Sequence, residues 1–575
     1  MSDFDYRRRR TSTVGIGGIP LGGDNPIRVQ SMTSTSTMDT EGSLAQIRSI
    51  SAAGASYVRL TAQGVREAEN IGLMSRTLES AGEHIPLVAD IHFNPRAALA
   101  AAAVVQKVRI NPGNFVDPGR TFRRIEYTDA EYAEELKRIE DGLLPLLDIC
   151  REHGTALRIG VNHGSLSDRI MSRYGDTPAG MVESAMEFLR VCRTHDFDQV
   201  VISIKASNTV VMVETVRLLV AAMESENMAF PLHLGVTEAG DGEDGRVKSA
   251  VGIGALLAEG IGDTIRVSLS EDPALEVPVA QELVDYITAR ASAPLIGGEP
   301  MAGYNPVNPQ RIPSAQVGNI GSDRPAVVVS DAPVDMPQGQ TAPDYVYAEG
   351  KLHAADGTAL NVVEVDAAMP DTAVAKLKAA TDAVAVLHSS HANPVGELRA
   401  AAHALRRAGV TNPIIMRLTY GALLAETLAI RAAADSGALL LTGHRDGLWL
   451  RADGHSNEEL TRLTFGILQA ARQRITRTEY ISCPGCGRTL FDLQSVIRRV
   501  KEATSHLNGL KIGIMGCIVN GPGEMADADY GYVGAAAGHV SLYRGKECVE
   551  KNIPESEAIG RLIAIIKESG DWKDA

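Results

Sequence analysis

Residues 86–111, PLVADIHFNPRAALAAAAVVQKVRIN, contain one complete strand–helix–strand unit. Two short apolar runs, 86–90 and 107–110, flank an alanine-rich segment with helical character at 96–103. The runs are almost continuously apolar, which is typical of parallel strands that are covered by helices. This stretch therefore predicts a β/α architecture built on a parallel sheet.

The same unit recurs along about the first 290 residues. Eight strands are predicted in all, at 27–31, 57–60, 86–90, 107–110, 156–161, 199–204, 231–236 and 264–268. Alanine-rich helical segments separate them, at 43–53, 66–81, 96–103, 129–153, 178–194, 209–224 and 248–259. Eight such units close most simply into a (β/α)8 barrel of the TIM type, which we expect for residues 1–292.

The composition changes at about residue 293, where Pro, Gly, Ser and Asn predict a linker. A second β/α domain is expected within 293–465, with strands near 326–330, 361–366, 383–388, 412–417 and 438–442 and helices at 371–380, 395–408 and 421–434. Its polar residues have no spacing that suggests a site, so we expect an inserted spacer domain; they are His388, His391, Arg417, His444 and Arg445. Residues 466–575 are expected to form a third, α+β domain.

The chain is acidic, with a net charge of −15 over 575 residues. This balance argues against a general nucleic-acid-binding protein. The basic run at the N-terminus is not followed by an apolar segment, so it does not read as a secretory signal. No stretch approaches the roughly 18 apolar residues that span a membrane. A cytoplasmic protein without nucleic-acid or membrane partners is expected.

Charged and polar residues stand at the C-terminal ends of the predicted barrel strands. These ends meet at one rim of a TIM barrel, where the active sites of this fold lie. The residues concerned are Arg59, Asp90, His92, Arg109, Asn111, Arg158, Asn162, Lys205, Glu238, Arg266 and Ser268. Two like charges about 4 Å apart repel by about 4 kcal/mol at an effective dielectric of about 20, so five cations in one mouth predict an anionic ligand. For any single one of these cations, a salt bridge with a helix carboxylate explains its presence about as well as an anionic ligand does.

Three of the six cysteines lie near the C-terminus, Cys483 and Cys486 in a CxxC and Cys517 after an apolar run. A structural zinc site would need a fourth ligand, from Cys548, His506 or His539. A thioredoxin-like CxxC would leave Cys517 without a role, and buried inert cysteines fit poorly with a turn that contains Pro and Gly. An iron–sulfur cluster with three thiolates and one unusual ligand is the fourth explanation. The residues alone support zinc and the cluster equally.

The segments CPGCGRTLFD (483–492) and IMGCIVNGPGE (514–524) closely resemble the 4-hydroxy-3-methylbut-2-enyl diphosphate synthase family of the non-mevalonate isoprenoid pathway. The resemblance continues in the barrel, for example in VQSMTSTSTMDT (29–40), RIGVNHGSL (158–166) and LHLGVTEAG (232–240). It covers about 15–290 and 470–575. The additional 293–465 span resembles the long, three-domain form of that family.

The resemblance implies an oxidoreductase that opens the ring of 2-C-methyl-D-erythritol 2,4-cyclodiphosphate reductively and eliminates water. Two electrons would come from ferredoxin or flavodoxin through a four-iron four-sulfur cluster. By resemblance the cluster ligands are Cys483, Cys486, Cys517 and Glu524, and a carboxylate would leave one iron exchangeable. The diphosphate would be held by Arg59, Arg109, Arg158, Lys205, Arg266 and Ser268.

The same resemblance suggests how the remaining mouth residues act. Asp90, His92 and Asn162 would hydrogen-bond substrate hydroxyls or order the rim. Glu238 would deliver a proton to the leaving oxygen, with a salt bridge to a rim cation as the alternative. The family dimerises through its barrels, which predicts a homodimer. A zinc-stabilised β/α scaffold or binding protein without redox activity is the competing function.

Overall fold

The computed structural model describes residues 4–117, 126–519 and 521–574. The chain divides into two compact units, and each is described by itself. The larger unit comprises Arg9–Gly245, Ile261–Gln281 and Thr478–Ala575. The smaller unit comprises Met1–Arg8, Arg246–Gly260 and Glu282–Arg477.

Parallel strands form a barrel in the larger unit, in the order β6-β5-β4-β3-β2-β1-β8-β7. A parallel bridge between Ile202 and Leu232 joins β6 to the segment before β7 and completes the circle. The strands are β1 (Arg28–Met32), β2 (Tyr57–Thr61), β3 (Leu87–Asp90), β4 (Lys107–Ile110), β5 (Ala156–Asn162), β6 (Val200–Lys205), β7 (His233–Leu234) and β8 (Thr264–Ile265). The predicted TIM-type barrel is thus confirmed, although β7 and β8 are shorter than predicted.

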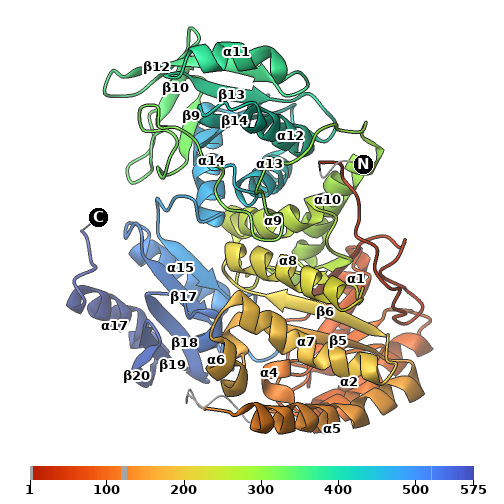
Figure 1. The fold of residues 1–575 in the computed structure, drawn as a ribbon. Helices are drawn as coiled ribbons and strands as arrows, with labels where there is room; N and C mark the ends of the chain where they lie inside the picture. The colour runs from red at the N-terminus through yellow and green to blue at the C-terminus, as the bar shows by residue number, and fades with distance from the viewer. Residues whose placement is uncertain (1–3, 118–125, 520, 575) are drawn as a thin grey trace. The chain divides into compact units, whose positions relative to one another are not determined.

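Helices connect these strands and lie outside them, as α5, α7 and α8 do beside β5 and β6 in Figure 1. They are α1 (Thr40–Ala52), α2 (Val65–Ser80), α3 (Pro95–Ala102), α4 (Pro112–Phe115), α5 (Asp129–His153), α6 (Asp168–Tyr174), α7 (Pro178–Thr194), α8 (Thr209–Ser225), α9 (Gly242–Ala258) and α10 (Glu276–Thr288). Asparagine side chains cap two of them: Asn94 accepts from the first N–H groups of α3, and Asn208 from those of α8. These caps fix where the helices begin after β3 and β6.

An apolar plug closes the N-terminal end of the barrel. The segment before β1 folds back on itself through paired hydrogen bonds between Val14 and Leu21. Together with Ile16, these side chains pack against Tyr57 and Val88 and are fully buried. Because this end is filled by apolar side chains, a ligand site is left only at the C-terminal end of the strands.

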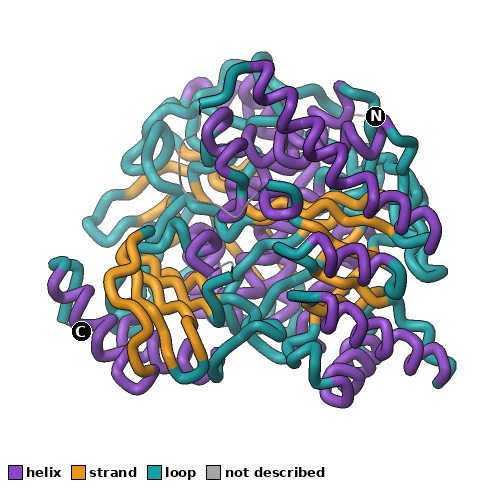
Figure 2. The backbone as a smooth tube through the Cα atoms, turned by 90° about the horizontal axis from the view of Figure 1, so that it is seen from below, coloured by secondary structure: helices purple, strands orange, loops and turns teal. Residues whose placement is uncertain are grey.

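The C-terminal domain of the larger unit is a five-stranded sheet in the order β16-β17-β18-β19-β20. In Figure 2 it is the group of orange strands near the C label. Its strands are β16 (Glu479–Ser482), β17 (Lys511–Met515), β18 (Tyr530–Ala536), β19 (His539–Arg544) and β20 (Glu547–Pro554). The helices are α15 (Leu493–Thr504), α16 (Gly521–Glu524) and α17 (Glu555–Glu568). Leu562 and Ile566 of α17 share one core with Val496 and Val500 of α15. An α+β fold was predicted for this region.

The smaller unit contains a second, closed barrel in the order β10-β11-β12-β13-β14-β15-β9. Its strands are β9 (Val327–Ser330), β10 (Tyr345–Ala348), β11 (Lys351–His353), β12 (Ala359–Asp366), β13 (Val384–His388), β14 (Ile414–Tyr420) and β15 (Gly447–Ala452). Its helices are α11 (Asp371–Ala379), α12 (Pro394–Arg407), α13 (Ala425–Leu440) and α14 (Asn457–Ala470). Buried Asp435 on α13 accepts hydrogen bonds from Tyr286 on α10 at 2.6 Å and from Tyr420 at 3.0 Å, and pairs with Arg290.

One predicted strand of this unit is wrong. Residues 438–442 belong mostly to the end of α13, and the final strand is β15, several residues later. The apolar run was read as a strand, but it continues an alanine-rich segment that is buried on nearly all sides. A helix and a strand that are both fully buried have the same unbroken apolar pattern, so periodicity does not separate them. The β10–β11 hairpin and α14 were not predicted.

No helix in the described residues is both long and apolar enough to cross a membrane.

Candidate functional site

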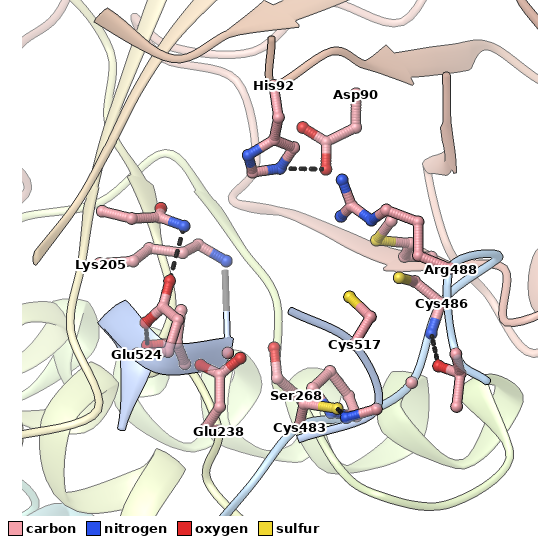
Figure 3. A pocket seen from close by; sticks show the side chains of 18 of the residues that line it. Asp90, His92, Lys205, Glu238, Ser268, Cys483, Cys486, Arg488, Cys517 and Glu524 are labelled. Carbon is pink, nitrogen blue, oxygen red and sulfur yellow. Dashed lines mark hydrogen bonds and ion pairs between the residues drawn. The ribbon is translucent and has the colours of Figure 1, made fainter. Parts of the chain in front are cut away.

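A single pocket at the C-terminal end of the first barrel brings the predicted site residues together. It contains about 780 Å³ of empty space, open solvent included. The barrel contributes Arg59, Asp90, His92, Arg109, Arg158, Asn162, Lys205, Glu238, Arg266 and Ser268, and the C-terminal domain contributes Cys483, Cys486, Cys517 and Glu524. Figure 3 shows side chains from both regions facing the same space. The whole pocket lies within the larger unit.

Asp90 organises one side of the mouth. Its carboxylate accepts from Arg109 Nη1 at 2.9 Å and lies 3.8 Å from Arg59 Nε. Burial disfavours its charge, but Arg109 and Arg59 outweigh burial and hold the pKa of Asp90 well below its usual range. Burial and Arg109 lower the pKa of His92 to about 3, so this imidazole is neutral at pH 7. Its Nε2 then accepts from Arg109 Nη1 at 2.6 Å.

Arg266 has a carboxylate partner of its own. Glu276, the first residue of α10, accepts from Arg266 Nε and Nη2 at 2.9 Å each. Both side chains are buried. Arg266 and Arg109 therefore form salt bridges, the alternative role that the sequence left open for each rim cation. The partner of Arg266 is a helix carboxylate.

Unlike Arg109 and Arg266, Arg158 and Lys205 have no carboxylate partner among the described residues. Arg158 is 1% exposed, and its Nε and Nη1 atoms have no hydrogen-bond partner in the part of the chain that the structure describes. Burial and the neighbouring arginines lower the pKa of both Arg158 and Lys205 well below their ordinary values. Buried cations without a counter-charge are costly, so this part of the mouth is complete only with an anion.

The three cysteines line the same pocket. Cys483 Sγ accepts the backbone N–H of Gly516 at 3.2 Å, an interaction that favours a thiolate. Burial raises the pKa of the Cys483 thiol to about 12, so an ion or cluster of high positive charge would be needed to keep it deprotonated. Burial also raises the pKa of Cys150 and Cys192 to about 12, and neither of these lines the pocket.

Glu524 joins the C-terminal domain to the barrel. Its Oε1 accepts from Asn162 Nδ2 at 2.8 Å and its Oε2 from Thr237 Oγ1 at 3.0 Å. Burial and the nearby Glu238 raise the pKa of Glu524 well above its ordinary value. Each carboxylate oxygen has more than one lone pair, so these hydrogen bonds leave Glu524 able to bind a metal.

A close backbone contact accompanies these hydrogen bonds. A Cβ atom placed on Gly164 would lie 2.1 Å from the carbonyl carbon of Gly523, and one on Gly523 would lie 2.4 Å from Gly164 O. Only glycine fits at either position. This contact holds the segment that carries Glu524 against the end of β5 in the same chain.

The donor set fits a metal cluster better than a single ion. The three thiols and Glu524 line one pocket, yet among the described residues no three His, Cys, Asp or Glu side chains converge closely enough to hold one metal ion. Tetrahedral zinc needs such convergence, with sulfur about 2.3 Å from the metal. Cys548, His506 and His539, the candidates for a fourth zinc ligand, do not line the pocket. Three thiols and one carboxylate in one pocket are a donor set that suits an iron–sulfur cluster.

Three polar residues of the pocket were missed in the sequence, Thr237, Arg488 and Thr489. Thr237 precedes Glu238 and holds Glu524, while Arg488 follows Cys486 and faces Asp90 and His92. Thr237 and Arg488 could have been found because each lies close in sequence to a predicted site residue. Glu238 itself has a positive φ of 49°, a strained backbone conformation that often accompanies function.

Polar residues of the second barrel contact other side chains of the same barrel. Arg417 pairs with Glu364 at 3.1 Å and stacks on Trp449. The ring of His444 contacts that of His403 in the core.

Comparison with known proteins identifies the family. The model of the GcpE TIM-barrel domain matches residues 11–281, and that of the GcpE protein C-terminal domain matches 479–568. The relative from Bacteroides fragilis named 4-hydroxy-3-methylbut-2-en-1-yl diphosphate synthase (flavodoxin) is 56% identical over 612 aligned residues, which cover 100% of this chain and 98% of the relative. Relatives of the same name are 44% identical in Akkermansia muciniphila (100% and 98%) and 40% identical in Leptospira interrogans (99% and 98%). The chain belongs to the GcpE family of 4-hydroxy-3-methylbut-2-en-1-yl diphosphate synthases.

Proposed function

We propose that this enzyme opens the ring of 2-C-methyl-D-erythritol 2,4-cyclodiphosphate reductively and eliminates water, giving 4-hydroxy-3-methylbut-2-enyl diphosphate. The observation that carries the proposal is the shared pocket of unpaired cations and three cysteines. The cations suit a diphosphate and the thiols suit a redox cluster. The relatives' shared name supports this reading over the competing function, a zinc-stabilised scaffold.

The cations would bind the diphosphate in two ways. Arg158 and Lys205, which have no carboxylate partner among the described residues, would take the diphosphate oxygens directly. Arg59, Arg109 and Arg266 are oriented by Asp90 and Glu276, so their free N–H groups would be held in place before substrate arrives. Ser268 would add a hydroxyl donor from the same rim.

Cys483, Cys486, Cys517 and Glu524 would hold a four-iron four-sulfur cluster. When bound, the cluster would supply electrons singly and offer one iron whose carboxylate ligand exchanges for substrate oxygen. Asn162 and Thr237 would orient the Glu524 carboxylate toward the cluster, since both already donate to it. Flavodoxin, named for the relatives, is the proposed electron donor, with ferredoxin as the alternative.

Glu238 would deliver a proton to the leaving oxygen. It lines the pocket beside Glu524, and its charge contributes to the raised pKa of that carboxyl. Asp90 would act mainly by orienting Arg109, and Asn162 by binding Glu524.

We assign substrate binding to residues 1–292, a spacer role to the inserted residues 293–465 and cluster binding to residues 466–575.

Hydrogen bonds from Asn162 and Thr237 to Glu524 lie within one chain and support an intramolecular active site. We place the enzyme in the cytoplasm and infer a homodimer in which each chain carries its own site.

Anaerobic purification tests the function. We expect iron and acid-labile sulfide in equal amounts, absorbance at about 400 nm, and turnover of the cyclic diphosphate with reduced flavodoxin. Cys517→Ser should lose cluster and turnover together, whereas Cys192→Ser, a buried thiol outside the pocket, should keep both. A protein that binds zinc in place of iron would refute the proposal.

Glu524→Ala should retain the cluster on its three thiolates but lose nearly all turnover. The reason is that the exchangeable iron site and the contacts with Asn162 and Thr237 change together. Iron content and steady-state rate measure the two effects separately. Loss of iron from this variant would make Glu524 a structural ligand.

Arg158→Met should weaken binding of the diphosphate roughly ten- to one-hundred-fold, the equivalent of about 1.5–3 kcal/mol for hydrogen bonds to a charged group. The melting temperature should stay equal or rise, because a buried cation without a carboxylate partner is removed. Arg76→Met on the exposed face of α2 is the matched control. A large fall in melting temperature at unchanged affinity would contradict this role.

Subunit mixing tests the intramolecular site. A Cys517→Ala chain mixed with an Arg158→Ala chain, assayed at a substrate concentration too low for the Arg158→Ala chain to bind, should show no gain in activity, because each chain has a defect in its own site. Activity that reappears in the mixed dimer would show that the site is shared between subunits.

A further inference from the structure

Arg488 occupies a place in the pocket that the proposed reaction leaves without a role. It follows Cys486 by two residues, on the loop between β16 and α15. Figure 3 shows it reaching from the cysteine loop toward Asp90 of the barrel. A cation at this position faces both the thiols and the barrel mouth.

The backbone on each side of Arg488 is fixed. Cys486 N–H donates to Thr489 Oγ1 at 3.0 Å, and Thr489 N–H donates back to Cys486 O at 2.9 Å. At Gly487 a Cβ atom would lie 2.7 Å from Thr35 O, so the loop is seated directly on the barrel rim. The direction of the Arg488 side chain is therefore set by the loop and not by an ion pair alone.

Arg488 is held in its charged form. A guanidinium stays protonated in proteins, and the side chains of Cys486, Asp90 and Cys517 lie within electrostatic range of Arg488. Asp90 already accepts from Arg109 and lies close to Arg59, so Arg488 is not required to neutralise it. Its Nε has no hydrogen-bond partner among the described residues, which leaves a donor available on the side chain.

Reduction of a metal group on the cysteines by one electron adds one negative charge to the pocket. A fixed cation beside two of the three thiolates favours the reduced form, because the attraction is strong where water is largely excluded. We propose that Arg488 is a positioning residue that raises the reduction potential of the cluster and so helps it accept an electron from the flavoprotein donor. The assignment rests on the proposed function, since it requires the cluster.

A purely structural alternative is that Arg488 only fastens the cysteine loop to the rim at Asp90. The two roles differ in what they change. If Arg488 only anchors the loop, its replacement changes the cluster content and the thermal stability. If its charge sets the reduction potential, its replacement shifts the equilibrium between oxidised and reduced cluster while the cluster content stays constant.

The experiment compares the midpoint potentials of four proteins by spectroscopically monitored redox titration. They are the wild type, Arg488→Gln, Arg488→Lys and the control Arg498→Gln, whose side chain is exposed on α15. Iron, sulfide and melting temperature are measured on the same samples. At a fixed potential, the ratio of reduced to oxidised cluster in Arg488→Gln should fall at least about tenfold, which equals about 59 mV for one electron. Arg488→Lys should recover most of the shift, and Arg498→Gln should match the wild type.

Three results would overturn the assignment. An unchanged potential in fully loaded Arg488→Gln would remove the electrostatic role, and loss of cluster from that variant would make Arg488 an assembly residue. An equal shift in Arg498→Gln would show a general effect of net charge. A wild type that binds no cluster would instead refute the proposed function, and the assignment with it.

Discussion

The structure depends on one electrostatic constraint, the burial of more cations than carboxylates at the mouth of the first barrel. Asp90 and Glu276 each hold an arginine, but Arg158 and Lys205 have no carboxylate partner in the described part of the chain. Such an arrangement works against stability, and the apolar packing of the barrel, including the plug at its N-terminal end, offsets its cost. The protein in this sense is built around a ligand of opposite charge.

The C-terminal domain completes the same arrangement from the other side. It brings the Cys483 thiol, whose pKa is raised by burial, and the Glu524 carboxyl, whose pKa is raised by burial and by Glu238. The proposed metal cluster would reverse both effects, as the proposed diphosphate would for the arginines. The proposed cofactor and substrate thus suit the ionisation of the side chains that would bind them.

Much of this could be predicted from the sequence, and the failures have physical reasons. The barrel strands were found because each is a short apolar run between helical segments, and their ends gave the rim residues because parallel strands end together. The 438–442 strand failed because a buried helix has the same apolar run. The bond from Thr237 to Glu524 joins residues 287 positions apart, and nothing in the local sequence specifies such a pairing. Arg488 was overlooked because its direction depends on a contact with Thr35 in the barrel.

The contact between Gly164 and Gly523 has a consequence for how this protein can change over time. Because each backbone occupies the space that a side chain on the other would need, neither position accepts even alanine without a shift of the segment that carries Glu524. A replacement at one position cannot be compensated at the other, since glycine is already the smallest residue. Drift in the sequence is therefore barred at this pair by geometry alone, whichever substrate or electron donor the enzyme meets.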